Sequence, residues 1–213
     1  MYLNESAGAA VTSLTYQPND TLEAVLCRAQ SNAFLPKGTV RCEGPPAFRT
    51  QLARDLGCLL DVDADVDAWS CLPAILGSGE GAHIPDFLVR RGSRHTLIDA
   101  GSGPGHAWLE GAARDRGCDY EAWPTVSIRE GFRLANAKDL LRYARWECPL
   151  GDRIRLLGTL DEAGSLSLGE CLSAFRETRQ MAGLASLALQ RFVEIELDEA
   201  RIGPETTVRR RRR

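Results

Sequence analysis

Apolar residues recur along the first two thirds of the chain with spacings that separate helices from strands. From residue 48 to residue 60 they fall every three or four positions, which is the period of an amphipathic helix. Residues 87–89 and 96–98 are short apolar runs on either side of a turn at 91–93, a pattern that predicts a β-hairpin. The expected elements are a helix at 21–30, a helix at 48–60, a strand at 66–76, the hairpin at 83–101, a helix at 106–116, a strand at 118–123 and a helix at 132–146. This order predicts an α/β domain whose mixed sheet is flanked by helices.

The pattern changes after a linker at residues 149–151, where three amphipathic helices precede two short strands. Three helices followed by a β-hairpin are typical of a winged-helix-like domain. We therefore expect an N-terminal arm at 1–45, the α/β domain at 46–148 and a winged-helix-like domain at 149–213 with an arginine tail. The helices of the last domain are expected at 152–163, 168–175 and 181–190, and its strands at 192–197 and 206–208.

The composition narrows the class of protein. With 213 residues and 44% apolar content, the chain is able to form a sizeable core. No run of 18 apolar residues occurs, and the N-terminus lacks a basic stretch followed by an apolar one, so we expect a cytoplasmic protein with no membrane partner. The seven cysteines never form CxxC, which favours reduced thiols over a disulfide or zinc framework. The net charge of −3 gives no overall basic field.

Two aspartates mark the predicted hairpin. Asp86 stands at the start of its first strand and Asp99 at the end of its second. Those ends lie side by side in an antiparallel pair, so we expect the two carboxylates to approach each other. Paired carboxylates suit a hard divalent cation such as Mg²⁺, whereas the alternative is that Asp86 simply caps the turn after Pro85. Asp86 and Asp99 are therefore the candidate catalytic and metal-binding residues.

Several short motifs occur together in a fixed order. They are Leu59-Leu60-Asp61-Val62-Asp63-Ala64-Asp65-Val66, Leu72-Pro73, His83-Ile84-Pro85-Asp86-Phe87-Leu88-Val89, Leu97-Ile98-Asp99, Asn136 with Leu140-Leu141-Arg142-Tyr143, and the closing stretch 197–209. In this combination the chain resembles the TnsA-like transposase endonuclease subunits, a branch of the PD-(D/E)xK nucleases, over about residues 48–209. The resemblance implies a PD-(D/E)xK nuclease-like fold for the α/β domain and a role in DNA processing. It also implies a metal site made by a helical glutamate, the two strand carboxylates and a lysine.

The chain departs from that family pattern at two positions. The lysine position holds Gly101, and the glutamate position falls at or near Ala53. Loss of one charged group that stabilises the transition state typically costs about 10²–10³ in rate, so the resemblance implies a degenerate site that no longer cuts. If a displaced group restored activity, the chain would be a Mg²⁺-dependent DNA endonuclease with a remodelled site. The candidates for such a displaced group are Lys138, Arg90, Arg91 and Glu80.

Arginines supply the expected contacts to DNA. We expect a DNA-binding, non-cleaving subunit of a transposition or other DNA-processing assembly, which implies protein partners or self-association. The alternative is a winged-helix transcription regulator that reads an operator through the helix at 181–190. Deleting the terminal arginines should weaken DNA binding without unfolding the core, because such a tail has no apolar group to bury. The candidate DNA-binding residues are Arg176, Arg179, Arg191, Arg209, Arg210, Arg211, Arg212 and Arg213.

Overall fold

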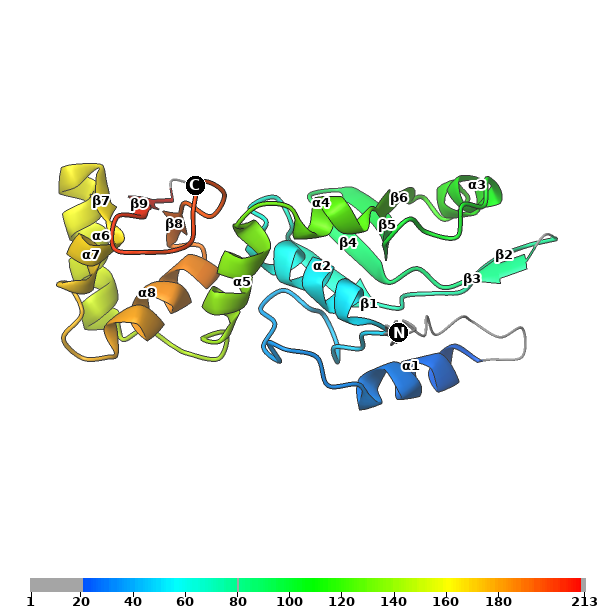
Figure 1. The fold of residues 1–213 in the computed structure, drawn as a ribbon, viewed down its shortest axis with the longest axis horizontal. Coiled ribbons are helices and arrows are strands. Elements are labelled where there is room, and N and C mark those ends of the chain that lie inside the picture. The colour runs from blue at the N-terminus through cyan, green and yellow to red at the C-terminus, as the bar shows by residue number, and fades with distance from the viewer. Residues whose placement is uncertain (1–20, 80, 212–213) are drawn as a thin grey trace, which may run out of the picture.

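The computed structural model describes residues 21–79 and 81–211, and its first part is a layered α/β unit (Figure 1). The elements of this unit are α1 (Leu22–Ser31), α2 (Gln51–Val62), β1 (Ala68–Cys71), β2 (Leu76–Ser78), β3 (Gly81–His83), β4 (Phe87–Arg91), β5 (Arg94–Ala100), α3 (Trp108–Arg114), β6 (Asp119–Trp123), α4 (Thr125–Arg129) and α5 (Arg133–Leu141). The main sheet has the order β1-β4-β5-β6, with β5 and β6 parallel and the other neighbours antiparallel. The expected mixed sheet flanked by helices is confirmed.

Successive side chains of β5 point to opposite faces of the sheet, and each face has its own hydrophobic cluster. Ile98 belongs to the large core, which also contains Leu56 of α2, whereas its neighbour Leu97 packs with Leu109 of α3 on the other face. Leu76 of β2 joins that second cluster, so the β2–β3 hairpin and α3 lie together (Figure 1). The sheet is thus covered on both faces.

Residues 21–45 lie against the α/β unit. Val25 and Ala29 of α1 are buried in its large core. The fully buried Arg54 of α2 donates from Nε to the carbonyl of Pro36 (2.8 Å) and from Nη2 to the carbonyl of Gly38 (2.8 Å). The described half of the expected arm is therefore attached to α2, and residues 1–20 lie outside the described ranges.

The prediction of a single strand at 66–76 is wrong. These residues are divided between β1 and β2, because Leu72 adopts a positive φ of 47° and turns the backbone. The Leu72 amide donates to the Asp86 carbonyl (2.9 Å), which closes the end of β1 against the start of β4. Four residues beyond that turn the chain enters the β2–β3 hairpin, which the sequence pattern did not predict.

The second part of the chain combines three helices with a three-stranded sheet. The three predicted helices are present, and Ser167 and Glu170 form the capping box typical of a helix start. The helix bounds and the strands differ from the sequence prediction: a strand follows the first helix, the second helix ends at Leu172 instead of residue 175, the strand expected at 192–197 covers only Val193–Ile195, and the last strand continues to Arg210 instead of ending at residue 208. The sheet order is β7-β9-β8. The elements are α6 (Leu150–Ala163), β7 (Ser165–Ser167), α7 (Leu168–Leu172), α8 (Gln180–Leu189), β8 (Val193–Ile195) and β9 (Thr207–Arg210).

A buried amide ties the two parts together. Asn136 of α5 donates from Nδ2 to the carbonyls of Leu197 (2.8 Å) and Ala200 (2.7 Å), and its Oδ1 accepts from the amide of Ile202 (3.0 Å). The side chain is fully buried, so these bonds satisfy it in place of water. Asn136 therefore holds the loop between β8 and β9 on α5.

Two features bear on the environment of the chain. All seven cysteines lie within the described ranges and are free thiols. Within those ranges we find no helix with both the length and the apolar character that crossing a membrane requires.

Candidate functional site

The register of β4 against β5 brings the two predicted aspartates together. Phe87 pairs with Ile98, so Asp86 and Asp99 are opposite each other at one end of the sheet. The Asp86 amide donates to Asp99 Oδ1 (3.1 Å), and the Ala100 amide donates to Asp86 Oδ2 (2.9 Å). The two buried carboxylates are thus as close as the hairpin predicts.

A guanidinium group lies between the two carboxylates. Arg49 immediately precedes Thr50, the N-cap of α2, and the start of that helix directs it to the end of the sheet. Its Nε and Nη2 both donate to Asp86 Oδ1, at 2.9 and 2.7 Å. The same Nη2 lies 3.6 Å from Asp99 Oδ1. Arg49 therefore supplies the positive charge that this pair requires.

The second oxygen of Asp99 is bound by two further side chains. His83, the last residue of β3, places Nε2 2.6 Å from Asp99 Oδ2 and donates with its hydrogen on that nitrogen. The hydroxyl of Tyr120, on the parallel neighbour β6, donates to the same oxygen (2.6 Å). Arg49, His83, Asp86, Asp99 and Tyr120 form what we term the carboxylate cluster, in which every carboxylate oxygen has a donor.

The cluster drives the pKa values of its two aspartates in opposite directions. Burial raises the pKa of Asp86, and the charge of Asp99 adds to that effect although Arg49 opposes it. Burial also acts to raise the pKa of Asp99, but the hydrogen bonds from His83 and Tyr120 and the charge of Arg49 bring it below the ordinary value. Burial and Asp99 together raise the pKa of the Tyr120 hydroxyl, which stays a donor. Asp99 is thus the firmly ionised member, and Asp86 is the first to take up a proton.

A divalent cation does not fit the cluster in this arrangement. A cation that bridged the two carboxylates would need the place of the Arg49 guanidinium, whose Nη2 lies 2.7 Å from Asp86 Oδ1 and 3.6 Å from Asp99 Oδ1. In the ranges that the structure describes, no group of three or more His, Cys, Asp or Glu side chains is arranged to hold a metal ion. The positive charge at this place belongs to the chain itself.

The two positions that depart from the family pattern carry no catalytic group. Gly101 follows β5 with a φ of +107°, a conformation that side chains disfavour, and its amide donates to the Trp123 carbonyl (2.7 Å). Ala53 is buried in the large core. The nearest acid along α2, Asp55, is itself buried and bound by the Lys138 ammonium (2.6 Å) and by Arg129.

The side chains that the sequence suggested as substitutes are engaged elsewhere. Lys138 binds Asp55, Arg90 lies 3.1 Å from Glu43 and Arg91 lies 3.3 Å from Asp63. Glu80 lies outside the described residues. Arg49 was missed, and the only sequence signal for it was a cation just before the helix that precedes the hairpin.

The predicted DNA-binding arginines are distributed over several elements. Arg176 and Arg179 are exposed before α8, and Arg209 is exposed on β9. Arg210 forms an ion pair with Asp161, and Arg211 donates to the Ala64 carbonyl (3.1 Å). The first three residues of the tail predicted at 209–213 are therefore part of the folded structure, because Arg209 and Arg210 belong to β9 and Arg211 is attached to the α/β unit. Arg212 and Arg213 lie outside the described residues.

The helix expected to read an operator is buried instead. Of the residues of α8, Ala182 to Leu187 and Leu189 are shielded from solvent. Ser186 donates to the Trp146 carbonyl (2.7 Å), and Arg191 donates from Nη2 to the carbonyls of Asp63 and Val66. A helix that enters a major groove needs an exposed face, so the prediction of base reading by 181–190 is wrong.

A basic groove that the sequence did not predict lies between α2, α5 and residues 35–38. It has a volume of about 660 Å³ and contains four cationic side chains with no acidic residue in its lining. Lys138 and Arg142 have ion pairs with Asp55 and Asp139, whereas Lys37 and Arg145 make none with the described part of the chain. The groove is lined by Leu35, Pro36, Lys37, Gly38, Gln51, Lys138, Leu141, Arg142, Ala144 and Arg145.

Comparison with known proteins was negative. No protein-family model matches the sequence, and no curated protein matches it.

Proposed function

We propose that this chain is a DNA-binding, nuclease-like protein that does not cut, and that it serves as a subunit of a transposition or other DNA-processing assembly. The observation that carries the proposal is the guanidinium of Arg49 between Asp86 and Asp99. The mixed sheet, with its antiparallel hairpin and parallel neighbour β6, supports a nuclease-like fold. The order helix, strand, helix, helix, strand, strand in the second part supports a winged-helix-like domain.

Arg49 neutralises the two carboxylates as a metal ion would, but it does not supply the chemistry of a bound metal ion. A bound metal ion lowers the pKa of a coordinated water and polarises the phosphate. A guanidinium group has only hydrogen-bond donors, stays protonated and has no open coordination position, so it generates no hydroxide nucleophile. Gly101 adds no ammonium beside it. The arrangement favours a nuclease-like scaffold over the alternative of a remodelled endonuclease.

The basic groove supports DNA as the ligand. Four cationic side chains line this groove without an acidic one, and two of them, Lys37 and Arg145, have no ion pair with the described part of the chain, so the groove provides a local positive charge on a chain of net charge −3. Phosphate groups are the natural partners of such a surface, since contacts to the DNA phosphate backbone supply a large share of protein–DNA affinity.

We expect no Mg²⁺- or Mn²⁺-dependent cleavage of linear, supercoiled or branched DNA by the purified protein. The reason is that the Arg49 guanidinium binds Asp86 and lies beside Asp99, where a metal ion would have to bind. In addition, residue 101 is a glycine instead of the lysine of the family pattern. Incubating labelled DNA with metal over a concentration series and resolving the products by electrophoresis measures this. Metal-dependent cutting that is lost in Asp86→Ala would refute the proposal and establish the endonuclease.

Reversing the charge of three groove residues should weaken DNA binding. In Lys37→Glu/Arg142→Glu/Arg145→Glu, the affinity should fall, and the slope of log affinity against log salt should flatten by about three, at about 0.9 per phosphate contact. Fluorescence anisotropy with a labelled duplex at several salt concentrations measures both quantities.

A matched control reverses three exposed arginines outside the groove, Arg94, Arg114 and Arg116. It has the same change in net charge, so a general charge effect would weaken binding equally. Equal affinity and slope in the groove variant and the control would remove the groove from the DNA surface.

A further inference from the structure

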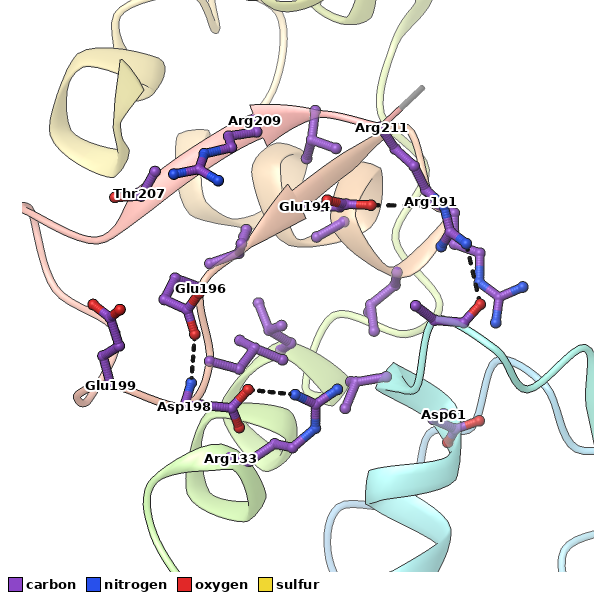
Figure 2. A pocket seen from close by; sticks show the side chains of 18 of the residues that line it. Asp61, Arg133, Arg191, Glu194, Glu196, Asp198, Glu199, Thr207, Arg209 and Arg211 are labelled. Atoms are coloured by element: carbon purple, nitrogen blue, oxygen red, sulfur yellow. Dashed lines mark hydrogen bonds and ion pairs between the residues drawn. The ribbon is translucent and has the colours of Figure 1, made fainter. Parts of the chain in front are cut away.

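A pocket of about 280 Å³ lies where the second part of the chain meets the α/β unit; we term it the junction pocket (Figure 2). Its lining contains charges of both signs. Figure 2 shows Arg191 and Arg211 with Glu194 at one end, which we term the cationic end, and Glu196, Asp198 and Glu199 with Arg133 at the other, which we term the acidic end. Arg41 also lines the pocket. The cationic end therefore combines arginines from three separate segments of the sequence.

The arginines of the cationic end are held by neutral groups. Arg41 donates from Nη2 to the Leu189 carbonyl (2.9 Å), and Arg191 donates from Nη2 to the carbonyls of Asp63 (2.9 Å) and Val66. Neither guanidinium has a carboxylate within 4 Å in the described ranges, and Arg211 has one only at 3.8 Å. Partly buried charges are normally paired. In the described ranges Glu194 is the carboxylate near Arg211, and Asp61 and Asp67 act on Arg41 only from beyond ion-pair distance, so this end of the pocket has no close ion pair for Arg41 or Arg191.

Unsatisfied polar atoms concentrate at the same place. Four buried side-chain polar atoms in the described ranges have no hydrogen-bond partner, and three of them belong to Arg41 (Nε), Arg191 (Nε) and Asp61 (Oδ2), all of which line the junction pocket. Burial and the charge of Arg191 lower the pKa of Arg41 to about 10. Burial, followed by the charge of Arg211, also lowers the pKa of Arg191. The three cations repel one another, and an anion between them would remove that repulsion.

We propose that the cationic end of the junction pocket binds a phosphate group, with Arg41, Arg191 and Arg211 as its ligands. Guanidinium groups match the geometry of phosphate oxygens and bind them through paired hydrogen bonds. The volume lies near the lower limit of about 300 Å³ for small-molecule sites, which suits a phosphate or a small phosphate ester. The acidic end is placed to accept hydrogen bonds from hydroxyl groups of such an ester.

Isothermal titration of the full chain in a phosphate-free buffer tests the proposal, with inorganic phosphate, sulfate and AMP as separate titrants. We expect saturable phosphate binding that Arg41→Gln and Arg191→Gln each weaken by about tenfold or more, the cost of losing a charged hydrogen bond. Arg210→Gln is the matched control, because Arg210 is the strand neighbour of Arg211 and pairs with Asp161 instead. It should bind phosphate as the unaltered chain does.

The outcomes separate the possible sources of the phosphate group. Tighter binding of AMP than of phosphate identifies an ester, and equal binding identifies the free anion. Sulfate binding as tight as phosphate binding would mean that the three arginines bind any tetrahedral oxyanion, and the assignment of the site to phosphate would be overturned. Absence of saturable binding of phosphate and AMP, or equal affinities in Arg41→Gln and Arg210→Gln, would overturn the site. If Arg191→Gln does not fold, Arg41→Gln still decides, since Arg41 makes a single side-chain hydrogen bond to the carbonyl of Leu189.

Discussion

Replacing Arg49 with methionine should lower the free energy of unfolding by about 3–5 kcal/mol at pH 8, the usual cost of leaving a buried charge without its partner. Arg49 makes two hydrogen bonds to Asp86 and lies 3.6 Å from Asp99, and its side chain is only 13% exposed. Methionine fills similar volume without charge. The variant therefore retains two carboxylates at the same strand ends with no cation between them.

The loss should be smaller at pH 5. Arg49 acts to lower the pKa of both Asp86 and Asp99, so its removal raises both. A carboxyl whose folded pKa exceeds its unfolded pKa binds a proton more tightly in the folded state, and stability then rises as the pH falls through the raised value. Asp86 begins with a raised pKa and is the first to be protonated. Protonation of Asp86 relieves the repulsion that the substitution creates.

Urea unfolding at pH 5 and pH 8 measures the effect. Arg49→Lys keeps the charge but not the paired donors and should lose less stability than Arg49→Met. Adding Asp86→Asn to Arg49→Met should recover much of the loss at pH 8, because the amide carries no charge. A loss of less than about 1 kcal/mol, or one that is independent of pH, would show that the guanidinium is not the counter-charge of the cluster.

Replacing Asp152 with alanine should lower the free energy of unfolding by about 3 kcal/mol or more. The carboxylate is fully buried and accepts from the amides of Arg176 (2.9 Å), Glu177 (3.1 Å) and Thr178 (3.0 Å), and also from Arg155. Each buried amide left without an acceptor costs about 1–3 kcal/mol. The substitution therefore releases the segment that connects α7 to α8.

The effect of Asp152 should diminish in acid. Although burial acts to raise the pKa of Asp152, the amide donors and Arg155 bring it below its ordinary value. A depressed carboxyl pKa contributes stability above the unfolded value and loses that contribution as the pH falls through the folded value. Thermal or urea unfolding from pH 7 to pH 3 measures this dependence. Asp161→Ala is the control on the same helix, where a half-exposed ion pair with Arg210 should contribute less than about 1 kcal/mol.

Local patterns predicted most of the helices and the central hairpin. Helix α2 and strands β4 and β5 were predictable because each buries one face, and the periods of 3.6 and 2 reveal that face directly. The β2–β3 hairpin was not predictable, because it depends on the positive φ of Leu72 and on contacts with α3 that no local pattern encodes. The residues of α8 from Met181 to Leu189 are apolar or glycine apart from Ser186, which is itself a sign of burial on every side and argues against a DNA-reading helix.

The candidate site was predictable only where its partners share one hairpin. Asp86 and Asp99 are 13 residues apart and are joined by a local strand pairing. Arg49 is 37 residues from Asp86, and its contact depends on how α2 packs on the sheet. The basic groove combines Lys37 with residues of α5 about a hundred positions later, and a sequence pattern has no means to bring such segments together.

Helix α8 contributes side chains to two hydrophobic cores. Ala185 and Leu189 belong to the core of the α/β unit, whereas Leu184 and Leu187 belong to the core of the second part. A chain cut at residue 148 would remove one side of the first core, and the separated fragment would expose an apolar helix face to water. The sequence pattern changes at this boundary, but the two parts are not independent folding units. We therefore expect them to unfold together in one cooperative transition.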